Sequence, residues 1–341
     1  MADKIILKST ELTGILGKNE IKKLSTVIEK KAWEEYRINY DLASNLNLLN
    51  FPIQLDFELN ASCNLKCPMC PISAESPKGK GKNTWFDFEF FKEIIDYSVK
   101  KGTRAIKLNY INEPLIRNDL IKFIEYAKLK GILDIYFSTN GILLKKELSK
   151  KLIKSGLTRI QISIDAFTQN IYNKVRPGGN LNTIIENVND FLLLRKELNS
   201  QIPLVRVNFV KTEYNEHELD KFVDFWKDQV DMIGIQEFIK PTKVTSSIKS
   251  KKTIKKKNFK CSFPFKQLVI NNEKQVLPCC TFWGEELALQ KIDKAEDLLE
   301  AWNSDKMINL RNERLQKLIY LKLKINFKAI RVLKLPVFQI L

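Results

Sequence analysis

Short apolar runs alternate with longer amphipathic stretches along most of this 341-residue chain. The apolar runs have the length and composition of strands: Ile53–Leu59, Ala105–Leu108, Leu133–Phe137, Arg159–Ile164, Leu204–Val210 and Met232–Phe238. The amphipathic stretches between them have helical length: Glu89–Lys101, Asp119–Lys130, Lys145–Ser155, Thr183–Leu198 and Glu216–Asp228. Strands that alternate with such helices indicate βαβ units, whose strands are parallel. The pattern therefore predicts an α/β fold, a partial (β/α)6 barrel rather than a closed eightfold one.

Three cysteines, Cys63, Cys67 and Cys70, follow the first strand with C-x3-C-x2-C spacing. Thiolates suit iron–sulfur clusters, and three of them leave one iron of a cubane cluster without a protein ligand. Such an open iron favours catalysis, because a small molecule can bind there. Zinc is an alternative, but structural zinc sites use four ligands, the only histidine is His217, and the next cysteine is Cys261. A disulfide framework is typical of small secreted chains, a class that this chain does not resemble.

The cysteine loop at the end of a first strand resembles the radical S-adenosylmethionine (radical SAM) superfamily, over about residues 51–310. Further segments match the family in order. Asn112-Glu113-Pro114 resembles the usual Gly-Gly-Glu-Pro without its glycines, and Phe137–Gly141 resembles the third-strand Thr-Asn-Gly segment. Ile162–Ala166, followed by Arg176–Gly179, resembles the fourth-strand segment that contacts the cofactor.

The resemblance implies a [4Fe-4S] cluster on the three cysteines and S-adenosylmethionine on its open iron. Met69 is then expected near the adenine, and Glu113, Ser163 and Arg176 at polar groups of the cofactor. The implied reaction is reductive cleavage of S-adenosylmethionine followed by hydrogen abstraction, in an oxidoreductase-like enzyme. The implied substrate is a peptide or a sugar or polysaccharide precursor, and the implied electron donor is a flavodoxin or ferredoxin. Two alternatives stay open: a catalytically impaired homologue and an iron–sulfur electron-transfer protein.

Candidate residues follow four successive strands of the predicted barrel. The cysteine loop follows the first strand, Glu113 the second, Asn140 the third and Asp165 the fourth. Parallel barrels place their chemistry at the carboxyl ends of the strands. We therefore expect these residues at one edge of the barrel, called here the carboxyl rim.

A second cysteine set, Cys261, Cys279 and Cys280, flanks two strand-like runs that predict a hairpin. The hairpin is expected to bring Cys261 close to one of the other two. The pattern resembles the SPASM or twitch extension of radical SAM enzymes, which implies a second, auxiliary iron–sulfur cluster. The cysteines that such extensions usually carry further downstream are absent from this sequence, so the extension is incomplete.

The net charge of +17 comes almost wholly from two segments. Nine lysines and no acidic residue lie within residues 240–260, and eight basic residues against one acidic residue lie within residues 311–341. Clustered basic residues can bind nucleic acid, but the first segment has one aromatic residue and favours a solvated linker. A clamp on an anionic substrate or partner is the alternative.

The first fifty residues of the chain carry no recognisable site. Lys18–Lys31 and Ala32–Leu48 are predicted to be helical, with Trp33, Tyr36 and Tyr40 packed against the barrel. The tail from about residue 315 is either a frameshifted end or an amphipathic basic helix for a membrane surface. No apolar run is long enough to cross a membrane, and the start of the sequence does not resemble a signal peptide. The cluster-type spacing of the cysteines suggests a reducing environment. Together these observations predict a cytoplasmic location. The expected segments are a helical extension (1–50), the barrel (51–240), the linker (241–260), the auxiliary domain (261–310) and the tail (311–341).

Overall fold

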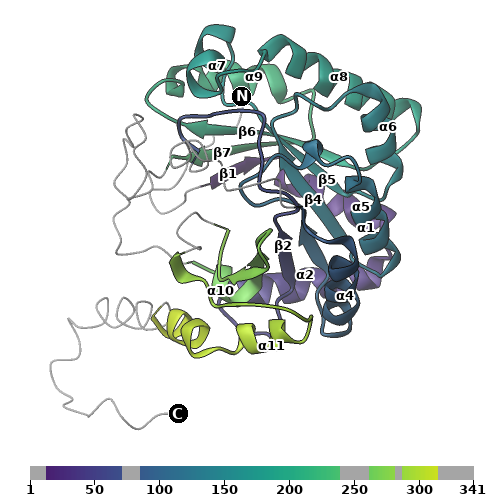
Figure 1. Ribbon diagram of the computed structural model, residues 1–341. Coiled ribbons are helices and arrows are strands. Elements are labelled where there is room, and N and C mark those ends of the chain that lie inside the picture. The colour runs from purple at the N-terminus through teal and green to yellow at the C-terminus, as the bar shows by residue number, and fades with distance from the viewer. Residues whose placement is uncertain (1–12, 71–84, 239–260, 281–285, 314–341) are drawn as a thin grey trace, which may run out of the picture.

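The computed structural model describes residues 13–70, 85–238, 261–280 and 286–313. Within these ranges one sheet has the strand order β1-β7-β6-β5-β4-β3-β2-β8-β9-β10. Its centre consists of the predicted parallel strands: β2 (Gln54–Phe57), β3 (Ala105–Lys107), β4 (Asp134–Thr139), β5 (Arg159–Ser163), β6 (Leu204–Lys211) and β7 (Met232–Glu237). The predicted partial barrel is confirmed, and the sheet is not closed because β1 and β10 lie at its two ends (Figure 1).

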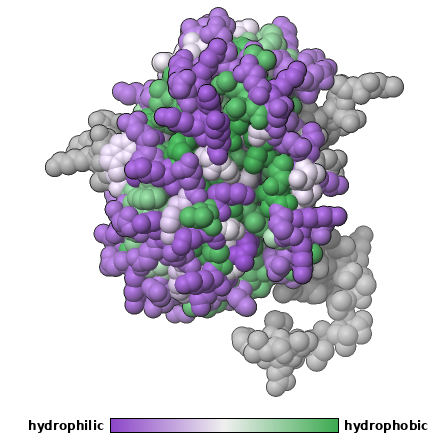
Figure 2. Space-filling model, turned by 90° about the vertical axis from the view of Figure 1, so that its right-hand side faces the viewer, coloured by the Kyte–Doolittle hydropathy of each residue, from purple (hydrophilic) through white to green (hydrophobic). Residues whose placement is uncertain are grey.

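Helices join successive parallel strands and cover the outer face of the sheet (Figure 1). They are α4 (Phe88–Lys100), α5 (Leu120–Leu129), α6 (Lys146–Lys154), α7 (Gln169–Val175), α8 (Leu181–Glu197) and α9 (Leu219–Trp226), with the short 3-10 turns η2 (Pro114–Ile116) and η3 (Glu216–Glu218). Apolar side chains from the strands, such as Phe57, Phe137 and Phe209, are fully buried in one cluster with the helices. The helices turn their polar sides outward, and the side shown in Figure 2 mixes hydrophilic residues with smaller hydrophobic areas.

The opposite, inner face of the sheet is polar. Side chains along a strand alternate between the two faces, so the residues between the apolar ones point into the barrel. Tyr136 and Ser138 on β4, Gln161 on β5, and Arg206 and Asn208 on β6 belong to this face. The barrel therefore has a hydrophobic layer outside its strands and a polar interior.

The N-terminal segment contributes a strand as well as helices. β1 (Thr13–Leu16) pairs antiparallel with β7, and it is followed by η1 (Lys18–Lys23), α1 (Leu24–Val27) and α2 (Lys30–Ser44). The helix expected over Lys18–Lys31 stops at Val27, because Ile28 is extended and Glu29 caps α2 through Lys31 N at 3.0 Å and Ala32 N.

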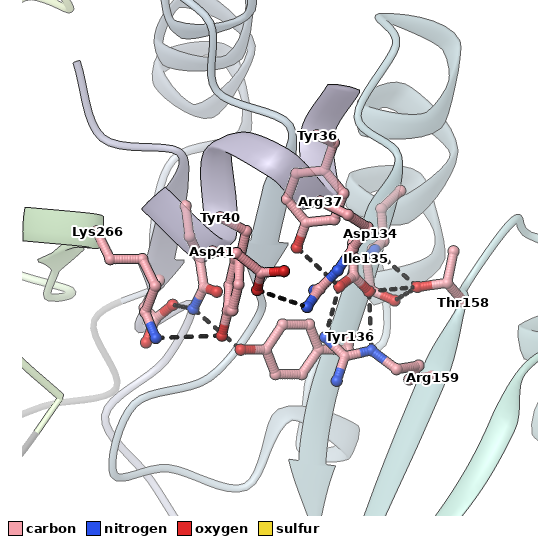
Figure 3. Close-up of polar contacts among 12 residues, drawn as sticks. Tyr36, Arg37, Tyr40, Asp41, Asp134, Ile135, Tyr136, Thr158, Arg159 and Lys266 are labelled. Carbon is pink, nitrogen blue, oxygen red and sulfur yellow. Dashed lines mark hydrogen bonds and ion pairs between the residues drawn. The ribbon is translucent and has the colours of Figure 1, made fainter. Parts of the chain in front are cut away.

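Helix α2 packs across the amino ends of the barrel strands. Trp33 and Tyr36 are buried against Ile53, Ala105, Leu204 and Met232, with Tyr40 packed beside them, which confirms the predicted packing role of all three aromatic residues. Tyr36 Oη donates to Asp134 Oδ2 at 3.1 Å, and Asp134 also binds Arg159 (Figure 3). The amino end of the barrel is therefore covered by α2.

The C-terminal segment forms the predicted hairpin and joins it to the barrel. It contains α10 (Phe263–Lys266), β8 (Gln267–Ile270), β9 (Gln275–Leu277), β10 (Gln290–Lys291) and α11 (Asp297–Trp302). β8 and β9 are antiparallel, while β8 also pairs in parallel with β2 and extends the barrel sheet. The expected basic linker and most of the expected tail lie outside the described residues. No helix of the described chain has both the length and the apolar character that crossing a membrane requires.

Candidate cluster and cofactor site

The cysteine loop leaves β2 at the carboxyl rim and is tied to the segment after β3. Glu113 N donates to Ser62 O at 2.9 Å, and Asn60 Nδ2 donates to Glu113 O at 3.3 Å. Asn112 Nδ2 in turn donates to Asn60 Oδ1 at 2.7 Å. These bonds give the loop a fixed position, so the position of its thiols is set by two neighbouring strands.

The three thiols of the loop, Cys63, Cys67 and Cys70, are not joined in a disulfide. Among the described residues, no three or more His, Cys, Asp or Glu side chains are arranged to hold a single metal ion. A cubane cluster binds each thiolate to a different iron, so its three sulfur ligands need not converge on one ion. Burial raises the pKa of Cys63, and it raises the pKa of Cys67 to about 11 against the opposing charge of Arg176. Binding of a metal centre here therefore releases protons.

Arg176 lies beside the cysteine loop, with Nη1 3.9 Å from Cys67 Sγ. The other side of its guanidinium binds the buried Asp165, with Nε at 2.8 Å and Nη2 at 2.5 Å from Oδ2. Asp165 has a φ of 60° and accepts Val210 N at 2.7 Å, which fixes the carboxylate on the rim after β5. The side chain of Arg176 is thus already held between Asp165 and Cys67, and its contact with the cofactor stays a prediction.

Glu113 is buried after β3, and its carboxylate binds the turn after β4. It accepts Thr139 Oγ1 at 2.7 Å, Asn140 N at 2.8 Å and Leu115 N at 3.0 Å. Burial raises the pKa of Glu113, and these hydrogen bonds act in the opposite direction. An ionised carboxylate has about four acceptor positions, so about one remains for a cofactor group.

Asn140 joins the turn after β4 to the cysteine loop. Its Nδ2 donates to Asn64 Oδ1, between two of the cysteines, at 2.7 Å. Ser163, at the carboxyl end of β5, is partly exposed, and its hydroxyl makes no hydrogen bond within the described residues, while Met69 packs against the main core. The structure therefore brings residues that follow β2, β3, β4 and β5 to one rim around the cysteine loop.

Tyr172 on α7 belongs to the same site, although the sequence analysis did not single it out. Its side chain is fully buried, and its hydroxyl has no hydrogen-bond partner within the described residues. Burial raises the pKa of Tyr172, and the charges of Arg176 and Cys67 act on it as well. A buried donor without a partner beside a cysteine thiol fits a sulfur-rich group at this loop, since a thiolate or sulfide accepts hydrogen bonds. Its spacing of four residues from Arg176 was the signal available in the sequence.

The second cysteine set flanks the β8–β9 hairpin, which lies next to β2 in the sheet. Cys261 precedes α10, and Cys279 and Cys280 follow β9. Cys280 packs against a small cluster that contains Val269 and Leu277, and burial raises its pKa to about 12. The charges of Lys107 on β3 and Asp56 on β2 also act on the pKa of Cys280: Lys107 lowers it and Asp56 raises it. The predicted approach of Cys261 to this pair stays a prediction.

Two family models match the chain. The radical SAM superfamily matches residues 58–225, and an iron–sulfur cluster-binding domain matches residues 261–321. The probable GTP 3′,8-cyclase of Methanococcus maripaludis is 30% identical over 181 residues, which are 53% of this chain and 57% of the relative. The GTP 3′,8-cyclase of Alkaliphilus oremlandii is 31% identical over 169 residues, 49% of this chain and 50% of the relative. The chain thus spans about half the length of these curated relatives.

Solved structures share the fold at low sequence identity. Streptococcus suis SuiB bound to S-adenosylmethionine has a TM-score of 0.61 at 18% identity, covering 78% of this chain and 69% of that one. The protein anSMEcpe with bound AdoMet has a TM-score of 0.57 at 14% identity, covering 76% and 79%. Together with the order of the rim segments, the two family models show that this chain belongs to the radical SAM superfamily, with an iron–sulfur cluster-binding domain on its C-terminal side.

Proposed function

We propose that this chain is a radical SAM enzyme whose cluster is held by Cys63, Cys67 and Cys70. The observation that carries the proposal is the placement of all three thiols on one loop at the carboxyl rim, between Glu113 and Arg176. When bound, the cluster supplies an electron that cleaves S-adenosylmethionine to a radical able to remove hydrogen from a carbon atom.

The residues around the loop have separable tasks in this proposal. Arg176 balances negative charge at Cys67 from 3.9 Å, and Asp165 holds it there. The remaining acceptor position of Glu113 and the unbonded hydroxyl of Ser163 receive polar groups of the cofactor. Met69 contributes apolar surface for the adenine. Within the described residues, helix α2 covers the opposite end of the barrel, so the reactive species is approached from the rim.

The substrate is the open part of the proposal. The curated relatives carry the name of a cyclase that acts on GTP, and SuiB is also known in a structure with a precursor peptide. These names support a nucleotide-like or peptide substrate, and a sugar precursor is the third candidate. An auxiliary cluster on Cys261, Cys279 and Cys280 is a second proposal, which the domain match over residues 261–321 favours.

The test is anaerobic reconstitution with iron and sulfide, followed by iron counting and measurement of 5′-deoxyadenosine after addition of S-adenosylmethionine and dithionite. The wild type is compared with a Cys63/Cys67/Cys70→Ala variant and with a matched Cys261/Cys279/Cys280→Ala variant. We expect about four irons to disappear with the first set, together with all cleavage. About four further irons lost with the second set would establish the auxiliary cluster.

Each other result has a definite meaning. A cluster on the first set without any cleavage would support the impaired homologue. A fully bound cluster that exchanges electrons but does not bind the cofactor would support the electron carrier. Wild-type protein that takes up no iron would refute the proposal.

A further inference from the structure

The inner face of the barrel is reached by solvent, although the outer face of the same strands is fully buried. Tyr136, Ser138, Arg159 and Arg206 on neighbouring strands are all partly exposed. Their apolar neighbours along the strands, such as Phe137, are completely buried under the helices. These four polar residues therefore keep some solvent contact on the inner face, whereas Gln161 and Asn208 beside Arg206 are buried.

Arg206 is the cation of this face whose charge is least balanced. It stands in register with Gln161 on β5, and its Nη2 donates to Gln161 Oε1 at 3.0 Å. Its Nε donates to Asn208 Oδ1 at 2.7 Å. Both acceptors are neutral amide oxygens, and within the described residues Nη1 makes no hydrogen bond and no carboxylate lies within ion-pair distance.

The other cations of the interior have acidic neighbours. Arg159 binds Asp134 with Nε at 2.8 Å and Nη2 at 2.6 Å. The charge of Lys107 acts on the buried carboxylate of Asp56 and lowers its pKa against the effect of burial. Burial and the neighbouring Arg159 lower the pKa of Arg206 to about 10, so it is still charged at neutral pH.

Gly234 on β7 leaves the room that Arg206 occupies. A Cβ atom at this position would lie 2.5 Å from Asn208 Oδ1 and 3.0 Å from Arg206 Nε. The absence of a side chain on β7 therefore allows the guanidinium to lie along the interior wall with its hydrogen bonds to Asn208 and Gln161.

A partly buried guanidinium with neutral partners is costly unless an anion offsets its charge. Its planar group with unused donors matches a carboxylate or a phosphate. On this basis we propose that Arg206 binds an anionic group, a carboxylate or a phosphate, of the substrate, and this rests on the proposed function. Ser163 and Asn208 are paired in register, two residues closer to the carboxyl rim than the pair of Gln161 and Arg206. A substrate anchored at Arg206 thus extends from the interior toward the cofactor.

The experiment measures anion binding directly, so it is independent of S-adenosylmethionine cleavage. Thermal unfolding of the reconstituted protein is followed with inorganic phosphate, with succinate, and with sodium chloride at equal ionic strength. We expect phosphate or succinate to raise the unfolding temperature of the wild type beyond sodium chloride, because a ligand that binds only the folded state stabilises it. The anion that acts identifies the group as phosphate or carboxylate.

Two variants make the result specific. Arg206→Gln is expected to bind the active anion about ten- to a hundredfold more weakly, as loss of a charge-assisted hydrogen bond predicts. Arg37→Gln, which removes an arginine of α2 that is already paired with Asp41, is expected to respond like the wild type. Without added anion, Arg206→Gln should unfold no earlier than the wild type, since an unbalanced charge has been removed. A wild type that responds to neither anion, an unchanged response in Arg206→Gln, or a clear loss of stability in this variant without anion would overturn the proposal.

Discussion

The Asp134→Asn substitution tests whether the ion pair under α2 holds the amino end of the barrel together. Asp134 is almost fully buried and accepts four hydrogen bonds: from Arg159 Nε at 2.8 Å and Nη2 at 2.6 Å, Thr158 Oγ1 at 2.9 Å, and Tyr36 Oη at 3.1 Å (Figure 3). The amide keeps the shape of the side chain but removes its charge. It also places an NH2 group where an acceptor stood.

The expected cost follows from the position of Arg159. Its side chain is 12% exposed against 2% for Asp134, so the variant leaves a largely buried cation without its carboxylate. Removal of one partner from a buried pair costs about 3–5 kcal/mol, and the partial exposure places this case near the lower end. We therefore expect the free energy of unfolding to fall by about 3 kcal/mol in urea denaturation.

Two controls separate this explanation from a general effect of the substitution. Asp190→Asn removes the carboxylate of an exposed pair with Lys146 at 3.5 Å and should cost less than about 0.5 kcal/mol. In the double variant Asp134→Asn/Arg159→Gln, the unbalanced cation is gone, so the two losses should not add. Equal effects of Asp134→Asn and Asp190→Asn, or additive losses in the double variant, would refute the reasoning.

Three further predictions concern the rim and the interior of the barrel. Tyr172→Phe should lower the reduction potential of the reconstituted centre by about 40 mV, because one hydrogen bond of about 1 kcal/mol is lost for a one-electron step. The potential is measured in a redox titration followed by electron paramagnetic resonance, and an unchanged value would contradict the role of the hydroxyl. Gly234→Ala should destabilise the protein by about 1–3 kcal/mol in urea, because the added Cβ would lie 2.5 Å from Asn208 Oδ1, and a stability equal to that of the wild type would show that the strand shifts freely. Burial raises the pKa of Asp56, so its charge costs stability above that pKa and the cost disappears as the pH falls through it. The wild type should therefore gain stability relative to Asp56→Asn as the pH is lowered from neutral toward the ordinary carboxyl pKa of about 3.9, and a constant difference would exclude the effect.

Local patterns were enough to predict the central strands of the fold. Each parallel strand buries its apolar outer face, so it appears in the sequence as a short apolar run such as Leu204–Val210, bounded by helices. The spacing of the three cysteines likewise indicated an open iron–sulfur cluster, whereas the role of Glu113 was implied by the family resemblance. The aromatic residues of α2 were predicted to pack because their spacing puts them on related helix faces.

The remaining features depend on contacts between distant parts of the chain. Pairing of Gln54 with Gln267 joins segments more than two hundred residues apart, and no local pattern indicates it. Tyr172 is an ordinary helical tyrosine in the sequence, and only the folded chain shows that its hydroxyl is buried where the charges of Arg176 and Cys67 act on it. The unbalanced charge of Arg206 is visible only when the acidic groups of all neighbouring strands have been located.

The pairing of β8 with β2 has a consequence for biosynthesis. Strands β8 and β1 lie outside the part that matches the superfamily, residues 58–225, and they pair with β2 and β7, the first and last of the six predicted parallel strands. While the chain emerges from the ribosome, β2 keeps an exposed hydrogen-bonding edge until residues 267–270 have been synthesised, and such edges pair with other chains. We therefore expect early termination after the barrel to yield a protein prone to aggregation, because the edge of β2 that β8 pairs with would stay open.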